Sequence, residues 1–279
     1  MIKNFRIIQF SILLTGICLT SCENETTSQD EIVTTNQVSQ KLLSKLADHD
    51  INTSDVNLVD FVLPNGKTTP MYKMEGDIHM SEDQIKGLNS LQGLSAKNYH
   101  TTNLVNQNTT IDIIGFTGPD FALSANEQSA LELAVNNYNN LGLSISFNLT
   151  FGTDFESEDM VVYNNDINED GAGGSAGFPE NGAPFKFVQI FGLTSSNVNV
   201  IEHVITHEIG HSVGFRHTDW FSRESCGQNT NEGTAGVGAI PIPGTPEGFD
   251  PTSVMLACFS SDEDGEFNEN DITALNFLY

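Results

Sequence analysis

The sequence predicts an α+β fold, in which several short strands are followed by a helix that carries His207 and His211. Short apolar runs bounded by Gly, Pro, Asn or Asp residues indicate the strands. Longer segments with apolar residues at helical spacing indicate the helices. Ser124 and Glu127 also have the spacing of a helix capping box, in which each side chain bonds the other residue's backbone. The expected order is strand, helix, three strands and helix, followed by loops and a closing helix.

Most of these elements fall in residues 108–279, which are predicted to form one domain. A Gly-rich stretch, 174–178, is expected to form an edge strand, and a long Gly- and Pro-rich loop, 218–250, follows the last histidine of the pattern described below. In chain order we expect strand 109–116, helix 124–141, strands 143–151, 160–163 and 185–191, a helix that starts at 197, and helix 269–279.

Residues 36–107 precede the catalytic pattern and are predicted to form a small α+β pro-segment. Ser81 with Gln84 makes a second capping box. The polar stretch 97–108 is the expected activation region. In chain order we expect helix 36–47, strand 58–63, a turn at 64–67, strand 71–80 and a helix from 81 to about 91.

One stretch, residues 207–217, has the composition of a metal site. His207 and His211 are four residues apart, so on a helix of about 3.6 residues per turn their side chains share one face. Gly214 can adopt the left-handed conformation that ends a helix, which would bring His217 back to the same ion. Three protein nitrogens leave one position for water, which is typical of a catalytic zinc ion.

Glu208 directly follows the first histidine, so on a helix its side chain points about 100° away from that of His207. From there it could reach a water molecule without binding the metal, and we expect it to take the water proton and deliver it to the leaving amine. His203 lies four residues before His207. The helical rise places His203 about 12 Å from His211, so we expect a packing or supporting role for it rather than a ligand role.

The His-Glu-x-x-His-x-x-Gly-x-x-His pattern over 207–217 resembles that of the metzincin metalloproteases, and its His-Glu-Ile-Gly-His form is similar to secreted bacterial HEIGH-type metallopeptidases. The resemblance implies a zinc endopeptidase with one catalytic zinc ion, and a twisted mixed sheet with the active-site helix above an irregular lower subdomain. It also implies a methionine-containing turn below the metal, for which Met255 is the candidate. Ala257 stands where astacins place an additional tyrosine ligand, so no further ligand is expected there. In metzincins, the edge strand binds a protein or peptide substrate in extended form.

The segment Met74-Glu75-Gly76-Asp77 is similar to the astacin pro-segment motif whose aspartate blocks the zinc ion. That similarity makes Asp77 a candidate latency ligand. Its carboxylate is a suitable zinc ligand, and Gly76 permits close backbone approach. The alternative is a Gly-Asp turn in a hairpin.

Three oxygen-bearing residues, Asp166, Asn168 and Asp170, alternate before Gly171, as at the start of a calcium loop. An EF-hand is not expected, because Gly177 occupies the position of its final glutamate. Calcium binding at these three residues and a solvated acidic, glycine-rich loop are the two alternatives.

The N-terminus has the pattern of a targeting segment, with two basic residues before an apolar run, 7–19, that is too short for a membrane span. The run ends in Leu-Thr-Ser-Cys, which resembles a bacterial lipoprotein signal and implies a lipid on Cys22. We expect a signal peptide, 1–21, a tether, 22–35, and a protein exported and lipid-anchored to the bacterial outer membrane or cell surface. The alternative is an ordinary secretory signal with an incidental cysteine.

Two cysteines, Cys226 and Cys258, remain after the lipidation site. An even pair in an exported protein predicts a disulfide, which would join the loops beside the metal. Two free thiols are the alternative.

The net charge of −26 excludes the basic surface that nucleic-acid binding requires. Taken together, the patterns predict a membrane-anchored zinc endopeptidase, made as a zymogen. Two alternatives are a non-catalytic surface-binding lipoprotein on a zinc-stabilised scaffold and a hydrolase of cell-wall amides. Glu208 favours an enzyme, because a purely structural metal site has no need of that glutamate.

Overall fold

The computed structural model describes residues 38–47, 53, 55–87, 99–233, 238–246 and 248–279. The described residues belong to one compact unit, 36–279. The predicted signal peptide and tether, with Cys22, lie outside them, as do residues 88–98, which include the first two residues of the expected activation region. No helix among the described residues is both long and apolar enough to span a bilayer.

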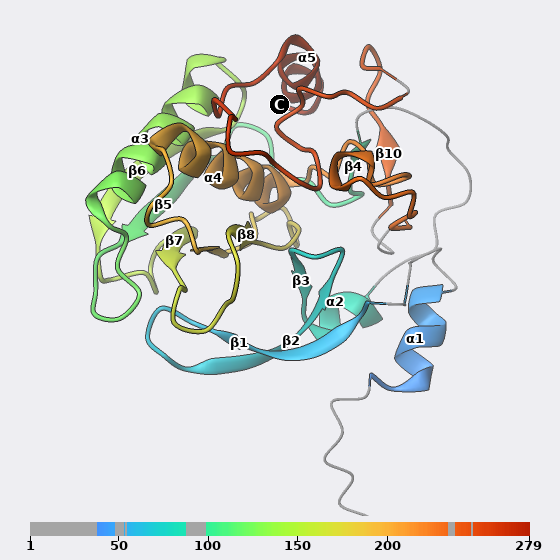
Figure 1. Ribbon diagram of the computed structural model, residues 1–279, viewed down its shortest axis with the longest axis horizontal. Coiled ribbons are helices and arrows are strands. Elements are labelled where there is room, and N and C mark those ends of the chain that lie inside the picture. Colours follow the sequence, from blue (N-terminus) through green and yellow to red (C-terminus); the bar gives the residue numbers. More distant parts are fainter. Residues whose placement is uncertain (1–37, 48–52, 54, 88–98, 234–237, 247) are drawn as a thin grey trace, which may run out of the picture. The chain divides into compact units, whose positions relative to one another are not determined.

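A five-stranded sheet forms the centre of the unit (Figure 1). Its order is β6-β5-β7-β9-β8; the first four strands are parallel, and β8 pairs with β9 in the antiparallel sense. The mixed sheet and the α+β class agree with the sequence prediction. The strands are β5 (Thr110–Phe116), β6 (Ser146–Gly152), β7 (Met160–Asn164), β8 (Gly173–Ser175) and β9 (Phe187–Phe191).

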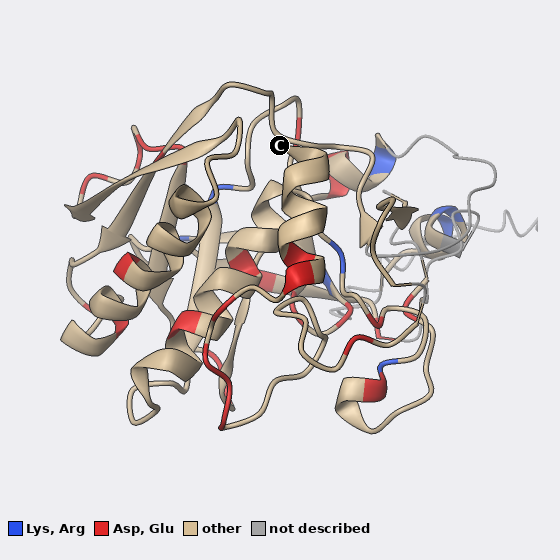
Figure 2. Cartoon of the chain, turned by 90° about the horizontal axis from the view of Figure 1, so that it is seen from above, with Lys and Arg blue, Asp and Glu red and all other residues tan. Residues whose placement is uncertain are grey.

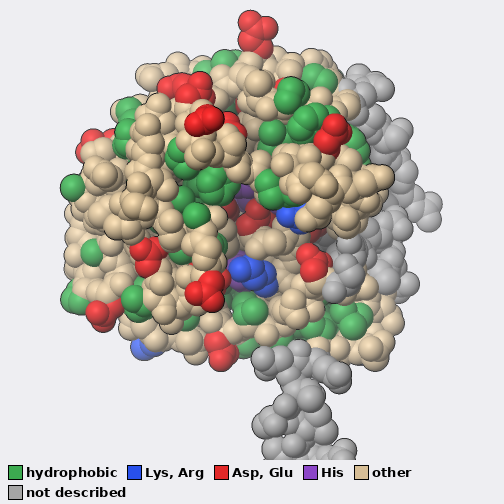
Figure 3. All heavy atoms as spheres, viewed as in Figure 1, with side chains coloured by type: hydrophobic (Ala, Val, Ile, Leu, Met, Phe, Trp, Pro, Cys, Tyr) green, Lys and Arg blue, Asp and Glu red, His purple; other side chains and the backbone are tan. Residues whose placement is uncertain are grey.

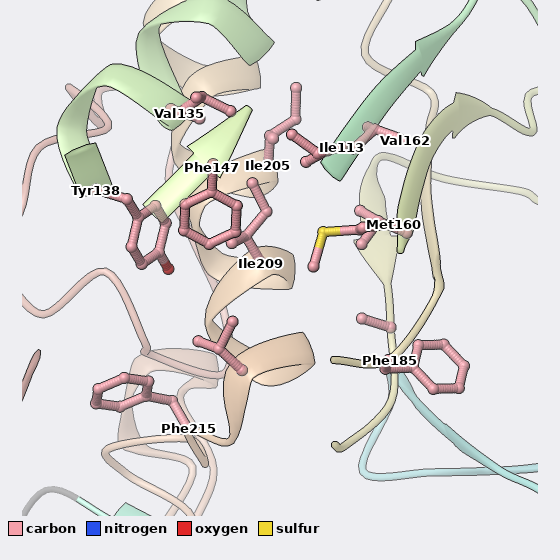
Figure 4. Packing of buried hydrophobic residues seen from close by; sticks show 14 of the residues in the cluster. Ile113, Val135, Tyr138, Phe147, Met160, Val162, Phe185, Ile205, Ile209 and Phe215 are labelled. Atoms are coloured by element: carbon pink, nitrogen blue, oxygen red, sulfur yellow. The ribbon is translucent and has the colours of Figure 1, made fainter. Parts of the chain in front are cut away.

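Two long helices, α3 (Ala125–Asn140) and α4 (Val198–Val213), bury their apolar sides against this sheet. Figure 4 shows Ile205 and Ile209 of α4 pointing toward Ile113 and Met160 of the sheet. These side chains are removed from water, which is the main favourable contribution to folding. The main core therefore holds α4, and with it the histidines, firmly on the sheet.

The helix ends have the capping chemistry that the sequence predicts. The hydroxyl of Ser124 accepts the N–H of Glu127, and the carboxylate of Glu127 accepts the N–H of Ser124 at 2.6 Å. Asn268 caps the closing helix α5 (Glu269–Leu278) in the same reciprocal way with Asp271. Such caps satisfy backbone donors that a helix leaves free at its first turn.

The predicted pro-segment forms a three-stranded antiparallel sheet with two short helices. One expectation was wrong: the strand predicted over 71–80 is two strands, because Glu75 (φ 56°) and Gly76 (φ 91°) adopt left-handed conformations that turn the chain. The second helix stops at Lys86, and 88–91 lie outside the described residues. The elements are α1 (Gln40–Ala47), β1 (Asn57–Val62), β2 (Thr68–Met74), β3 (Ile78–Met80) and α2 (Glu82–Lys86).

The pro-segment sheet packs directly on the central sheet. Tyr163 Oη and Gln189 Nε2 both donate to the carbonyl oxygen of Val62, at 2.6 and 3.0 Å. Beyond the last histidine, the chain forms the short helix η1 (Glu224–Cys226) and the strand β10 (Ile240–Pro241), which pairs with β4 (Tyr99–His100). Figure 2 shows acidic residues spread over helices and loops, with few basic residues among them.

Candidate metal centre

Helix α4 carries His207 and His211, and its two ends are sharply defined. Asn197 caps the first turn by accepting the N–H of Asn199. The helix ends at Gly214, whose φ of 115° is a left-handed conformation that glycine adopts without strain. The chain then turns back, so that His217 returns to the face that bears the two helical histidines.

The Nε2 atoms of three histidines converge on one point. Nε2 of His211 lies 3.0 Å from Nε2 of His207 and 3.1 Å from Nε2 of His217. Oδ2 of Asp77 lies 3.0 Å from Nε2 of His217 and 3.7 Å from Nε2 of His207. The four ligand atoms lie within 4.8 Å of one another, so this group could hold a metal ion.

Hydrogen bonds fix the other nitrogen of each ring. Nδ1 of His207 and Nδ1 of His211 each donate to a backbone carbonyl oxygen, at 2.9 and 2.8 Å. Nδ1 of His217 lies 2.8 Å from Oε2 of Glu232. A proton on each Nδ1 leaves the lone pair of Nε2 directed at the shared centre, which is how proteins orient histidine ligands.

Electrostatics favour the metal-binding protonation states of His211 and Asp77 but not that of His217. Burial lowers the pKa of His217, but the charges of Asp77 and Glu232 outweigh it and raise that pKa well above its usual value, so a metal ion must displace a proton from this ring. Burial and the neighbouring imidazoles lower the pKa of His211 well below its usual value, which keeps this ring neutral. Burial would raise the pKa of Asp77, but the charge of His217 and hydrogen bonds from His207 and His217 hold it well below its usual range. Neutral imidazole and ionised carboxylate are the forms that bind metal ions.

Asp77 lies in the turn between β2 and β3, as the hairpin interpretation expects, and its carboxylate also reaches the histidine cluster. Its role as a latency ligand stays a prediction. The next residues run along the edge of the central sheet. Ala176 donates its N–H to the carbonyl oxygen of Asp77 at 3.0 Å, and His79 donates its N–H to the carbonyl oxygen of Ala176 at 2.7 Å. The predicted pro-segment therefore pairs with the chain just beyond β8.

Glu208 is buried beside the cluster without belonging to it. A Cβ atom placed on Gly174 of β8 would lie 2.6 Å from Cγ and 2.7 Å from Oε1 of Glu208, so only glycine leaves room for this side chain. Oε2 of Glu208 has no hydrogen-bond partner among the described residues. Burial, followed by the charge of Asp77, raises the pKa of Glu208 well above its usual range.

Met255 lies directly beneath α4. A Cβ atom on Gly210 would lie 2.5 Å from the sulfur of Met255, so glycine at this position allows the close contact. Asp271 of α5 holds the methionine-containing turn in place: Ser253 Oγ donates to Oδ1 at 2.7 Å, and the N–H of Val254 donates to Oδ2 at 3.0 Å.

Residues 72–279 match the family described as "Dual-action HEIGH metallo-peptidase". The chain belongs to the HEIGH metallopeptidase family. The match starts within β2 and continues to the C-terminus, so it includes the Asp77 turn as well as the three histidines. The assignment makes this protein a metallopeptidase, whose substrates are proteins or peptides.

Two solved structures of myroilysin are similar to this HEIGH metallopeptidase. One has 13% sequence identity, covers 64% of this chain and 82% of its own, and gives a TM-score of 0.40. The other has 12% identity, covers 70% of this chain and 95% of its own, and gives a TM-score of 0.39. A comparison with curated proteins gave no match.

A cavity of about 420 Å³ opens beside the metal cluster of the HEIGH metallopeptidase. Figure 3 shows the hollow, with histidine atoms visible inside it and charged side chains near its margin. Lys73 of the pro-segment and Glu169 form an ion pair at its edge, with an N–O distance of 3.4 Å. Residues of the predicted pro-segment, Lys73, Gly76 and Asp77, form part of the cavity lining.

The predicted disulfide between Cys226 and Cys258 is present, with a Cα–Cα distance of 5.2 Å. Asp219 joins the same two loops. Its Oδ2 accepts the N–H of Ser225 at 2.9 Å, and its Oδ1 accepts the N–H of Ala257 at 3.0 Å. Together these links fix the wall of the cavity that follows the methionine-containing turn.

His203 does not join the three histidines of the cluster. It lines the cavity, and its ring lies 6.0 Å from that of Phe259, measured between centroids. Burial, and then the nearby His207, lower the pKa of His203 to about 3, so its ring is neutral.

Two of the three predicted calcium residues are engaged in hydrogen bonds, Asp166 with the loop after β9 and Asn168 with its own loop. Oδ1 of Asp166 accepts the N–H of Gly192 at 2.6 Å, and Oδ2 of Asp166 accepts the hydroxyl of Thr194 at 2.6 Å. Asn168 donates to Asn165 at 2.8 Å. The candidate metal groups among the described residues do not include Asp166 or Asp170. Calcium binding at this loop stays a prediction.

Three residues of the site were not found by sequence reasoning. Glu232, which fixes His217, lies in a long loop without a recognisable motif. Arg216 lies inside the histidine pattern, but its partner Glu75 is 141 residues away in the sequence. A buried pair of this kind becomes visible only when the two segments are folded together.

Proposed function

We propose that this HEIGH metallopeptidase is a zinc-dependent endopeptidase, made as a zymogen whose pro-segment occupies the metal site. The observation that carries the proposal is the convergence of three histidine Nε2 atoms and one carboxylate oxygen of Asp77. Three imidazoles whose Nδ1 atoms are held by hydrogen bonds suit zinc. The other oxygen of Asp77, Oδ1, is buried and has no hydrogen-bond partner in the described structure, which also suits a metal neighbour.

His207, His211 and His217 would hold the ion, and Glu208 would carry the proton. Zinc, when bound, supplies a Lewis acid that polarises a carbonyl group and acidifies water. The free oxygen of Glu208 accepts the proton of the attacking water and returns it to the nitrogen of the leaving amine. The raised pKa of Glu208 helps this carboxyl to keep the proton between the two steps.

Latency follows from two contacts of the same segment. Asp77 takes the position in which water would enter, and residues 77–79 hydrogen-bond to Ala176 beside β8. An extended substrate adds to a sheet through such edge groups. A docked pro-segment therefore blocks both the reacting centre and the edge at which a peptide would pair.

Removal of the pro-segment would also change the electrostatics of Glu208. The negative charge of Asp77 contributes to the raised pKa of Glu208, so its departure lowers that pKa. A larger fraction of Glu208 is then ionised and able to accept a proton. Activation would thus open the site and prepare its base.

We also propose that the chain is exported and anchored by a lipid on Cys22, as the N-terminal pattern suggests. Labelled palmitate should be incorporated into the wild-type chain and not into a Cys22→Ser variant. Equal labelling of both would refute this part of the proposal.

The central test compares zinc content and casein cleavage in the wild type and in Glu208→Gln, after limited proteolysis of the full chain. We expect both proteins to hold one zinc ion, and the variant to be about 100- to 10,000-fold slower. Glu180→Gln, which changes an exposed glutamate, serves as the control and should behave like the wild type.

Unchanged activity in Glu208→Gln would refute the role given to this residue. Zinc binding without cleavage of any protein by the wild type would instead support a binding lipoprotein. Digestion of peptidoglycan but not of casein would support a cell-wall amide hydrolase.

A further inference from the structure

A buried ion pair joins the pro-segment to the histidine loop. Nη2 of Arg216 donates to both oxygens of Glu75 at 2.7 Å, and the two side chains are 0% and 2% exposed. Arg216 directly precedes His217, and Glu75 lies two residues before Asp77. The ion pair is therefore next to the metal cluster but is separate from it.

A second guanidinium lies beside this pair. Arg223 donates to the carbonyl oxygen of Glu75 at 3.2 Å and forms an ion pair with Glu232, with an N–O distance of 3.1 Å. Glu232 is already engaged by Nδ1 of His217. We call the space that holds Glu75, with Arg216 at its carboxylate and Arg223 at its backbone carbonyl, the Glu75 pocket.

The Glu75 pocket has unused donor capacity. The Nε atoms of Arg216 and Arg223 are buried and have no hydrogen-bond partner in the described part of the chain. Backbone carbonyl oxygens of Gly233 and Gly238, with the ring of Phe178, hold the guanidinium of Arg216 in position. A guanidinium held in this way is a preorganised receptor for a carboxylate.

Emptying of the Glu75 pocket rests on the proposed zymogen function, in which the pro-segment leaves the enzyme. With the pro-segment docked, Arg216 faces Glu75, and Arg223 faces Glu232. Burial raises the pKa of Glu75 to about 8, against the attraction of Arg216, so the departure of Glu75 removes the group whose charge Arg216 stabilises. When the pro-segment leaves, two cations face one carboxylate, and that carboxylate is shared with His217. A buried cation without a partner is strongly unfavourable, so the emptied pocket favours a new anion.

We propose that the Glu75 pocket is a substrate subsite that binds an acidic side chain near the scissile bond. Gly76 and Arg223 line the same cavity as Asp77, His207 and Glu208, so the cleft borders the Glu75 pocket on its Arg223 side. A peptide that crosses the cleft can place a carboxylate where Glu75 now lies. A new N-terminal ammonium group would add a further positive charge and does not suit this position.

The first test uses the full chain after limited proteolysis and matched peptides that carry Glu or Gln at each position around the cleaved bond. At one position, Glu should raise kcat/KM by about 10- to 100-fold over Gln, as charged hydrogen bonds typically do. Most of the effect should appear in KM, because the carboxylate contact forms before the reaction.

Variants show whether this preference comes from the two arginines. Arg216→Gln and Arg223→Gln should each reduce the ratio between Glu and Gln peptides toward one, and Arg223→Lys should restore part of it. Arg223 is the safer variant for folding, since its side chain is 15% exposed. Lys186→Gln is the control and should keep the wild-type ratio. Lys186 lies outside the Glu75 pocket and donates to the backbone carbonyl oxygens of Glu156 and Glu158.

Binding provides a readout that does not depend on turnover. A synthetic peptide with the sequence of residues 72–81 should bind the activated enzyme about 10- to 100-fold more tightly than its Glu75→Gln analogue. Equal affinities, together with equal cleavage of Glu and Gln peptides, would overturn the subsite proposal while leaving the peptidase intact. If no peptide is cleaved at all, the proposed function fails instead, and the peptide affinities still decide whether the pocket prefers a carboxylate.

Discussion

Oδ2 of Asp77 lies 3.0 Å from Nε2 of His217, although 140 residues separate them in the sequence. The left-handed conformations of Glu75 and Gly76 turn the chain so that the carboxylate of Asp77 enters the histidine cluster. The pairing of residues 77–79 with Ala176 holds it there. A small turn in the predicted pro-segment thus completes a group of atoms that could hold a metal ion, the rest of which comes from the last third of the chain.

The first prediction concerns latency. In Asp77→Ala the pro-segment loses its contact with the cluster, so the uncleaved chain should gain activity. We expect an increase of about tenfold or more, since each 1.4 kcal/mol of lost docking energy corresponds to a factor of ten. Asp60→Ala removes an exposed carboxylate from the same segment and should leave latency unchanged. Full latency in Asp77→Ala would show that Asp77 does not silence the enzyme.

The second prediction concerns the carboxylate behind His217. Glu232→Gln keeps a hydrogen-bond acceptor at Nδ1 but removes its charge, so zinc affinity should fall by about 10- to 100-fold. Competition with a chelator at fixed free zinc measures this change. Glu224→Gln, an exposed change in the same loop, should have wild-type affinity. An unaltered affinity in Glu232→Gln would mean that this carboxylate does not support the metal.

The third prediction concerns the contact between α4 and Met255. In Gly210→Ala the new methyl group would lie 2.5 Å from the sulfur of Met255, so the protein should lose about 1–3 kcal/mol of stability to overpacking. Thermal unfolding measures the loss. Gly248→Ala is the matched control, because a Cβ atom there meets nothing within 4 Å. Equal melting temperatures for both variants would contradict the close contact.

The fourth prediction concerns the pH dependence of stability that Asp271 causes. Burial raises the pKa of Asp271 to about 6, although hydrogen bonds from Val254 and Ser253 act to lower it. The folded protein then binds this proton more tightly than the unfolded chain, in which the pKa of aspartate is about 3.9. The contribution of Asp271 to stability therefore falls as the pH rises from about 4 to about 6, by roughly 3 kcal/mol in total.

Asp271→Asn imitates the protonated carboxyl, because its amide can donate to Ser253 while its oxygen accepts the N–H of Val254. As the pH rises from about 4 to about 6, the wild type should therefore lose stability relative to Asp271→Asn, so the unfolding free energy of the variant minus that of the wild type should increase. A difference that stays constant from pH 4 to pH 7 would show that Asp271 is ionised throughout.

The fold and part of the site could be predicted because their signals are local. Capping boxes, such as that of Ser124 and Glu127, involve residues three positions apart. The helix that carries His207 and His211 ends at Gly214 in the left-handed conformation expected for glycine. Each of these features depends on a few neighbouring residues, which is the range that sequence patterns describe.

The features that could not be predicted depend on segments far apart in the chain. The strand was predicted to run through 71–80 because apolar residues stand on both sides of Glu75-Gly76-Asp77, although a Gly-Asp turn was the stated alternative for Asp77. The contact of Glu75 with Arg216, 141 residues away, accompanies the turn and leaves no local signal. Glu232 and Asp271 act through tertiary hydrogen bonds to His217 and to the methionine-containing turn. Sequence spacing carries no information about such contacts.

The most direct test of the central claim is a crystal structure of the full-length chain with anomalous diffraction recorded at the zinc absorption edge. The account predicts a single strong anomalous peak surrounded by Nε2 of His207, His211 and His217 and by the carboxylate of Asp77. A peak held by the three histidines without Asp77, or no zinc peak at this position, would contradict it.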